Sequence, residues 1–104
     1  MNIEAFQKAI TSAPIVISYF SYPACNVCKV LRPKIESLSA QYDEVAFLYV
    51  DTHEAPQLAG QYTIFTVPTI LIFVDGRESL RLSRNFSVGE VQAFLERMTG
   101  LMRA

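Results

Sequence analysis

Two cysteines separated by two residues are the strongest chemical signal in this sequence. The segment Cys25-Asn26-Val27-Cys28 directly follows a strand-like apolar run and opens a helical pattern. At the N-terminus of a helix, unpaired backbone N–H groups and the positive end of the dipole favour an anion. The Cys25 thiol is therefore predicted to ionise more readily than a free thiol and to act as the nucleophile. Cys28, one helical turn further on, is predicted to resolve a mixed disulfide formed at Cys25.

Other chemistries for this pair are a zinc half-site or two inert buried thiols. A structural zinc site takes four ligands, whereas the only other candidate ligand of this kind is the single histidine, His53. One chain cannot close such a site, so no metal is expected, although a metal shared between two chains stays open. The position of Cys25 at a helix start favours redox chemistry over inert thiols. His53 itself is predicted to be an exposed loop residue.

Hydrophobic periodicity predicts the elements that position the cysteine pair. The strand Ile15–Phe20 is apolar on both faces, which is typical of a central strand. Two parallel strands joined by a crossover helix and followed by a hairpin predict a mixed four-stranded sheet with helices on both faces. The predicted elements are a helix through Ile3, Phe6 and Ile10 capped by Asn2, strand Ile15–Phe20, a helix with the stripe Val27 to Tyr42 and a kink at Pro33, strand Val45–Val50, helix Ala55–Gln61, strand Thr69–Val74, a turn at Asp75-Gly76, strand Ser79–Ser83, and a helix begun by Ser87 and Glu90.

Length and composition limit the classes of protein to consider. With 104 residues, 51% of them hydrophobic, the chain is predicted to form a single domain over residues 1–104. A formal net charge of −1 gives no broad positive field, so nucleic acid is not an expected partner. The longest apolar run is far shorter than the roughly 20 residues that a membrane helix needs, and the acidic N-terminal segment does not read as a secretory signal. We therefore expect a cytoplasmic protein without membrane association, in which a disulfide is catalytic.

Taken together, these features resemble the thioredoxin family over nearly the whole chain. The resemblance implies a thioredoxin-like α/β fold and a thiol–disulfide oxidoreductase that acts on protein disulfides, contributes to cell redox homeostasis and needs no bound cofactor. It also implies an electron donor that is a reductase or a small thiol. The residues that carry it are the strand Ile15–Phe20, Cys25, Cys28, Lys29, Pro33, Asp51, Tyr62, Val67-Pro68-Thr69 and the turn Asp75-Gly76.

The resemblance also assigns a substrate groove. It implies that the Val67–Pro68 bond is cis and that the Val67 backbone pairs with a substrate segment beside Cys25. Thr66 and Ala24 are expected to border this groove, in which the family usually has a smaller residue and a tryptophan respectively. Arg84 takes the place of another small residue, and we interpret it as a solvated surface side chain.

Further departures from the family bear on the reaction. Asn26-Val27 replaces the usual Gly-Pro between the cysteines, which removes a conformationally fixed residue from the first helical turn. Tyr19 and Phe47 stand where thioredoxins typically have a buried aspartate and a lysine, and they are predicted to be core aromatics. Cys28 is then expected to depend on water for proton transfer, which predicts slower exchange near neutral pH.

Two further expectations concern assembly and turnover. The chain begins at its first helix, so we expect it to lack the N-terminal strand of full-length thioredoxins and to leave Val45–Val50 as an open sheet edge. An apolar, uncharged edge favours pairing with a second copy, which predicts a homodimer. The alternative to an enzyme is a thioredoxin-fold binding module whose groove holds a partner without turnover.

Overall fold

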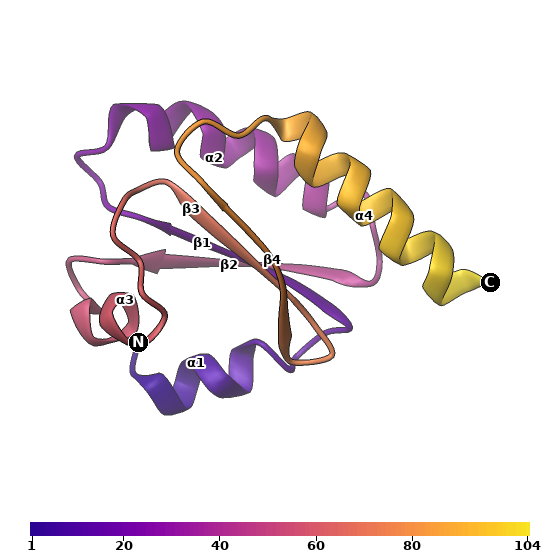
Figure 1. Ribbon diagram of the computed structural model, residues 1–104, viewed down its shortest axis with the longest axis horizontal. Coiled ribbons are helices and arrows are strands. Elements are labelled where there is room, and N and C mark those ends of the chain that lie inside the picture. Colours follow the sequence, from indigo (N-terminus) through magenta and orange to yellow (C-terminus); the bar gives the residue numbers. More distant parts are fainter.

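A mixed four-stranded sheet lies between two layers of helices in the computed structural model, which describes residues 1–104 (Figure 1). The strand order is β2-β1-β3-β4. Strand β1 pairs in parallel with β2 and antiparallel with β3, and β3 pairs antiparallel with β4. The predicted fold class is confirmed. The elements are α1 (Ile3–Ala9), β1 (Ile15–Ser21), α2 (Asn26–Ser39), β2 (Val45–Asp51), α3 (Pro56–Gln61), β3 (Thr69–Val74), β4 (Arg77–Ser83) and α4 (Val88–Arg103).

The central strand β1 supplies side chains to both halves of the core. All of its residues are buried, as its two-faced apolar pattern predicts. Ile17 and Tyr19 pack in one cluster with residues of α2 and α4, whereas Val16 and Phe20 pack in another with residues of α1 and α3. Figure 1 shows the same division, with α2 and α4 over one face of the sheet and α1 and α3 over the other.

Local signals in the sequence account for most element boundaries. The side chain of Asn2 accepts a hydrogen bond from the Ala5 N–H at 2.7 Å and caps α1. At the β3–β4 turn, Asp75 and Gly76 have φ values of 51° and 79°, the left-handed pair that a two-residue hairpin requires. Because this turn is so tight, Val74 already pairs with Arg77, and β4 begins two residues before the predicted start.

Helix α2 differs in extent from its predicted stripe. It runs without interruption through Pro33 and ends at Ser39, so Tyr42 lies in the following turn rather than in the helix. The Tyr42 N–H donates to the Ser39 carbonyl at 3.2 Å, and the ring still packs against the same core cluster. Apolar periodicity alone therefore overestimated the length of the helix, since the side chain of a residue in the following turn can pack against the same core.

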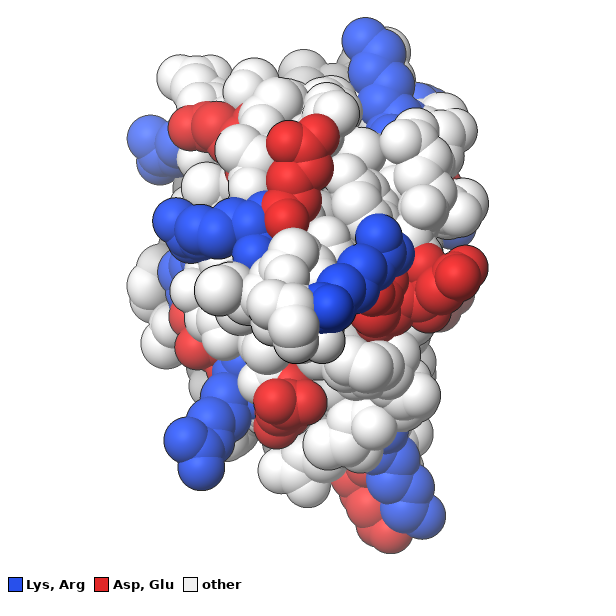
Figure 2. Space-filling view, turned by 90° about the vertical axis from the view of Figure 1, so that its right-hand side faces the viewer, with Lys and Arg blue, Asp and Glu red and all other residues white.

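The two edges of the sheet are formed by β2 and β4. Strand β2 thus occupies the predicted edge position, with all of its residues half-buried except the buried Val50. On the face of the molecule shown in Figure 2, acidic and basic side chains are interspersed and form no patch of one sign. None of the helices combines the length and the apolar character that crossing a bilayer requires.

Candidate redox site

The cysteine pair lies where β1 ends and α2 begins. Cys25 is the N-cap of α2, with an extended backbone (φ −78°, ψ 106°), and its Sγ accepts a hydrogen bond from the Cys28 N–H at 3.3 Å. The Cys25 N–H in turn donates to the Tyr22 carbonyl at 3.1 Å, which closes the loop between strand and helix. Cys25 and Cys28 form a disulfide, with their Cα atoms 5.2 Å apart.

Burial distinguishes the two sulfur-bearing residues. Cys25 is partly exposed, whereas Cys28 is only 3% exposed and belongs to the core cluster on the α2 and α4 side of the sheet. A disulfide or thiol arriving from solvent therefore has access to Cys25 in preference to Cys28. A nucleophilic thiol requires such access, whereas a resolving thiol needs only to reach its partner sulfur.

Tyr19 lies beneath the start of α2 and contacts the site through its hydroxyl. The ring is fully buried, which confirms that Tyr19 is a core aromatic, and the hydroxyl donates to the Cys28 carbonyl at 3.1 Å. Burial raises the pKa of Tyr19 to about 12, with a further increase from Tyr49 and an opposing effect of Arg32. The predicted core aromatic Phe47 is half-buried and lies beside Tyr19, with ring centroids 6.0 Å apart.

A hollow lined in part by residues of α2 adjoins Cys28. Its volume is about 220 Å³. The Arg32 guanidinium stacks on the Tyr49 ring at 3.8 Å and forms an ion pair with Glu36 at 2.6 Å. The hollow gives water access to the surroundings of Cys28, where the sequence predicts that water moves the proton. It is lined by Ser21, Tyr22, Pro23, Cys28, Lys29, Arg32 and Tyr49.

The loop before β3 carries the expected groove residues. The Val67–Pro68 peptide bond is cis, Pro68 is buried, and Thr66 and Val67 are partly exposed. The Thr69 hydroxyl donates to the Thr66 carbonyl at 2.7 Å, and the Arg84 N–H donates to the Pro68 carbonyl at 3.2 Å. A groove of about 250 Å³ lies beside this loop and is lined by Tyr22, Thr52, Ile64, Phe65, Thr66 and Val67.

Three other residues singled out in the sequence, Ala24, Arg84 and His53, do not line this groove. Ala24 is exposed in the loop before Cys25. Arg84 is exposed, directly follows β4 and has a φ of 62°, which is in the left-handed region. His53 is exposed, in agreement with its prediction, and its ring stacks on Tyr22 with centroids 4.3 Å apart. The stacking fixes a wall of the groove.

Sequence reasoning missed two aromatic residues of the groove, Tyr22 and Phe65. Tyr22 connects the two hollows, since it lines both of them. Phe65 is 90% exposed and is the most exposed large apolar side chain of the chain. The sequence could have indicated both residues, because each is an aromatic residue in a loop next to the cysteine motif or the proline motif.

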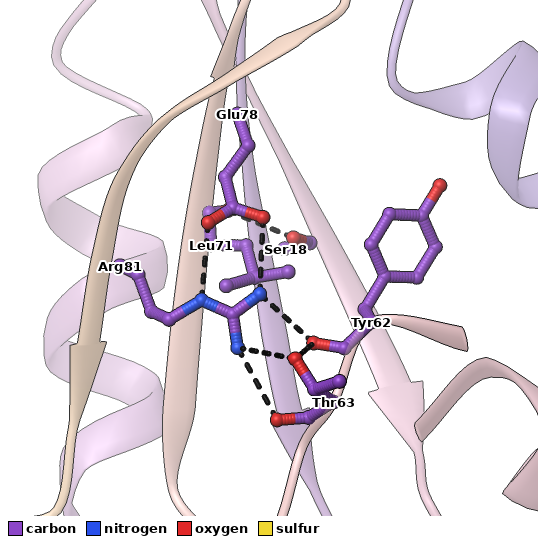
Figure 3. A network of polar contacts seen from close by, with 6 residues as sticks. All are labelled: Ser18, Tyr62, Thr63, Leu71, Glu78 and Arg81. Carbon is purple, nitrogen blue, oxygen red and sulfur yellow. Dashed lines mark hydrogen bonds and ion pairs between the residues drawn. The ribbon is translucent and has the colours of Figure 1, made fainter. Parts of the chain in front are cut away.

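Arg81 of the edge strand β4 forms hydrogen bonds to the start of the loop between α3 and β3, the loop that carries Phe65 and Pro68 (Figure 3). Its guanidinium donates to both carboxylate oxygens of Glu78 at 3.0 Å, to the Tyr62 carbonyl at 2.8 Å and to the Thr63 carbonyl at 3.3 Å. A planar fork with five donors can make these contacts at once. The start of the segment that leads to Phe65 and Pro68 is thereby fixed.

Comparison with known proteins identifies relatives over most of the chain. The sequence model of the thioredoxin family matches residues 1–97. Chlamydia trachomatis thioredoxin is 37% identical over 75 residues, which cover 72% of each chain. The thioredoxin-like protein YdfQ of Bacillus subtilis is 30% identical over 80 residues, which cover 77% of this chain and 71% of the relative. The structure of thioredoxin 1 from Thermosipho africanus superimposes with a TM-score of 0.80 at 35% identity and covers 86% of this chain and 99% of that one.

Proposed function

The chain belongs to the thioredoxin family and is a thiol–disulfide oxidoreductase, and from this premise we propose that Cys25 is its nucleophile and Cys28 its resolving thiol. The observation that carries this assignment is the unequal burial of the pair, because only Cys25 is open to an incoming disulfide. The position of Cys25 at the N-cap of α2 adds to it, since the helix N-terminus stabilises a thiolate there.

The proposed reaction transfers two electrons through one mixed disulfide. The Cys25 thiolate attacks a substrate disulfide, forms a new S–S bond and expels one substrate sulfur as a thiolate. Cys28, deprotonated, then attacks the Cys25 sulfur, expels the second substrate sulfur and leaves the Cys25–Cys28 disulfide. The substrate gains two electrons and two protons and becomes a dithiol, while the protein is oxidised to the state seen in the structure.

The partners of this reaction are thiol and disulfide proteins. Thioredoxins act on disulfide-bearing substrate proteins and are reduced by a reductase. For this chain we propose such substrates, bound beside Thr66, Val67, Pro68 and Ala24, and a reductase or small thiol as the donor that restores the dithiol. We further propose that residues 1–104 work as one domain in the cytoplasm and contribute to redox homeostasis there.

A trapping experiment tests the assignment of the two cysteines. In Cys28→Ser the first attack proceeds but resolution does not, so incubation of the reduced variant with insulin should give a covalent adduct that dithiothreitol releases. Cys25→Ser is the matched control and should give no adduct. Intact-mass analysis distinguishes the two outcomes. Equal adduct formation by both variants, or none by Cys28→Ser, contradicts the proposed roles.

The alternatives raised by the sequence are not favoured. Relatives that are thioredoxins by name and the intact Cys25–Cys28 pair support an enzyme over a binding module or a metal site shared between two chains. A binding module would hold insulin without reducing it. Precipitation of the reduced insulin B chain in the presence of dithiothreitol separates turnover from binding.

A further inference from the structure

The groove beside the cis-proline loop is linked to the cysteine pair through Tyr22. Tyr22, which forms one wall, accepts a hydrogen bond from the Cys25 N–H through its carbonyl. Val67, which forms another wall, directly precedes Pro68. A substrate segment whose disulfide meets Cys25 therefore places its neighbouring residues at this groove.

Four of the six residues that line the groove, Tyr22, Ile64, Phe65 and Val67, are hydrophobic. None of the six carries a charge, and their polar side-chain groups are the hydroxyls of Tyr22, Thr52 and Thr66, so an apolar side chain can contact Ile64, Phe65 and Val67 there. A charged side chain that entered the groove would lose hydration without gaining a charged partner, which is costly. The volume of about 250 Å³ is below the range of about 300–1,000 Å³ that is typical of small-molecule sites, so it suits a side chain.

Phe65 forms the outer border of this groove. Single exposed apolar residues are ordinary on protein surfaces, so its 90% exposure alone would carry no argument. Here, however, the exposed ring lines an uncharged groove together with Tyr22, whose carbonyl accepts from the Cys25 N–H. An aromatic ring in this position can cover an apolar side chain of the substrate and shield it from water.

The loop that presents Phe65 is held in place before any substrate binds. Arg81 donates to the Tyr62 carbonyl at 2.8 Å and to the Thr63 carbonyl at 3.3 Å while it pairs with Glu78 (Figure 3). The Ile64 N–H donates to the Ala59 carbonyl at 2.8 Å, which fixes the residue next to Phe65. Less ordering of the loop is then needed on binding, so more of the contact energy appears as affinity.

We propose that Phe65 is a specificity-determining residue that favours substrate proteins with an apolar side chain, leucine or phenylalanine, next to the disulfide cysteine. Arg81 is its positioning residue, since it holds the loop without touching the substrate. This inference rests on the proposed function, because it assumes that Cys25 attacks a disulfide bound along the Thr66–Pro68 loop.

A peptide series tests the selectivity. Disulfide-bonded peptides that differ only in the residue next to the attacked cysteine, Leu, Phe, Ser or Glu, are reduced by the wild-type protein with dithiothreitol as the electron source. The kcat/KM for the Leu and Phe peptides should exceed that for the Ser peptide by about tenfold, which is the scale of discrimination by an apolar pocket. In Phe65→Ala this ratio should fall to about twofold or less.

A matched control and a second substrate keep the outcomes distinct. Leu101→Ala removes another exposed apolar side chain, 66% exposed near the end of α4, and should keep the wild-type ratio. Equal rates for all four peptides, a preference for the Glu peptide, or an unchanged ratio in Phe65→Ala overturns the inference alone. Failure of the wild type to reduce any peptide and also hydroxyethyl disulfide overturns the proposed function together with it.

The role of Arg81 has its own test. Arg81→Met should lower the Leu-to-Ser ratio, and Arg81→Lys should restore it only in part, because an ammonium cannot reproduce the planar fork that reaches Glu78 and two carbonyls. A purely structural role would lower the thermal midpoint of Arg81→Met while the ratio stayed at the wild-type value. That result overturns the assignment of Arg81 as a positioning residue.

Discussion

At the residue scale, Tyr19 shows how one substitution in a buried strand changes the surroundings of a reactive pair. A carboxylate at this position would supply a proton acceptor near Cys28, whereas the tyrosine hydroxyl donates to the Cys28 carbonyl at 3.1 Å. Its pKa of about 12 keeps it protonated at neutral pH. Tyr19 therefore stabilises the backbone at the start of α2 and does not take up the Cys28 proton, so slow exchange at neutral pH remains our prediction.

The raised pKa of Tyr19 predicts a loss of stability in alkali. The folded protein favours the neutral phenol, so this contribution is complete below the unfolded-state pKa of 10.0 and is lost as the pH rises through about 12. Urea unfolding at a series of pH values should show the free energy of unfolding falling over this interval. The decrease should be smaller in Tyr19→Phe, and an equal decrease would contradict the prediction.

At neutral pH, Tyr19→Phe should cost about 1 kcal/mol, the net value of one hydrogen bond. Tyr42→Phe is the matched control, since that half-buried ring packs on the same core cluster. A smaller change in Tyr19→Phe than in Tyr42→Phe would show that the hydroxyl of Tyr19 contributes no net stability.

At the scale of elements, two glycines with different backbone conformations are expected to respond in opposite ways to substitution by alanine. Gly76 in the β3–β4 turn has a φ of 79°, and an added Cβ would lie 3.0 Å from Cγ2 of Thr11. Gly100 lies within α4, and an added Cβ there would meet nothing within 4 Å. The first position requires glycine, whereas the second only loses helix propensity by having it.

Alanine substitutions should therefore change stability in opposite directions. Gly76→Ala should destabilise the protein by about 1–2 kcal/mol, the cost of a left-handed residue with a side chain. Gly100→Ala should stabilise it by roughly 0.5–1 kcal/mol. Thermal and urea unfolding of both variants provide the measurement. A change in stability of the same sign in both variants would show that the left-handed backbone of Gly76 does not restrict which residue the turn accepts.

The capping box of α4 gives another prediction at this scale. The Ser87 hydroxyl accepts from the Glu90 N–H at 3.2 Å, and the Glu90 carboxylate accepts from the Ser87 N–H at 2.8 Å. Ser87→Ala should cost about 1 kcal/mol in urea unfolding. Ser79→Ala, which removes an exposed hydroxyl that only contacts the nearby Arg77 carbonyl at 3.0 Å, should cost much less. Similar losses in both would contradict the capping argument.

The elements and the cysteine pair were predictable because their signals are local. The Asp75-Gly76 turn and the Ser87 capping box each depend on residues within a few positions of one another. The side-chain contacts around the groove were not predictable in the same way. Tyr22 and His53 stack although 31 residues apart in sequence, and Arg81 reaches Thr63 across 18 residues. Such contacts depend on which strands and loops become neighbours, and residue periodicity does not specify that at the level of single side chains.

At the scale of the whole molecule, the exposed edge of β2 is the feature that bears on assembly. Its backbone pairs only with β1, and its side chains between Val45 and Tyr49 are half-buried and uncharged. An apolar edge with unpaired backbone groups favours pairing with a second copy. The homodimer predicted from the sequence therefore remains our prediction.

Light scattering over a range of protein concentrations tests this dimer. The wild type should approach twice the mass of one chain at high concentration, and Phe47→Lys, which places a charge on the edge strand, should remain at the mass of one chain. Leu101→Lys adds the same charge on α4 and should behave as the wild type. A wild-type mass of one chain at every concentration would exclude pairing through β2.

The end of α4 lies far from the disulfide. Arg103 pairs with Glu44 through two hydrogen bonds of 2.6 Å and 2.8 Å, and Figure 1 places the C-terminus at the opposite end of the molecule's long axis from the start of α2. The long axis measures 40 Å. Immobilisation on a resin through a tag fused after Ala104 would therefore orient the cysteines toward the mobile phase, which suits affinity purification of bound proteins.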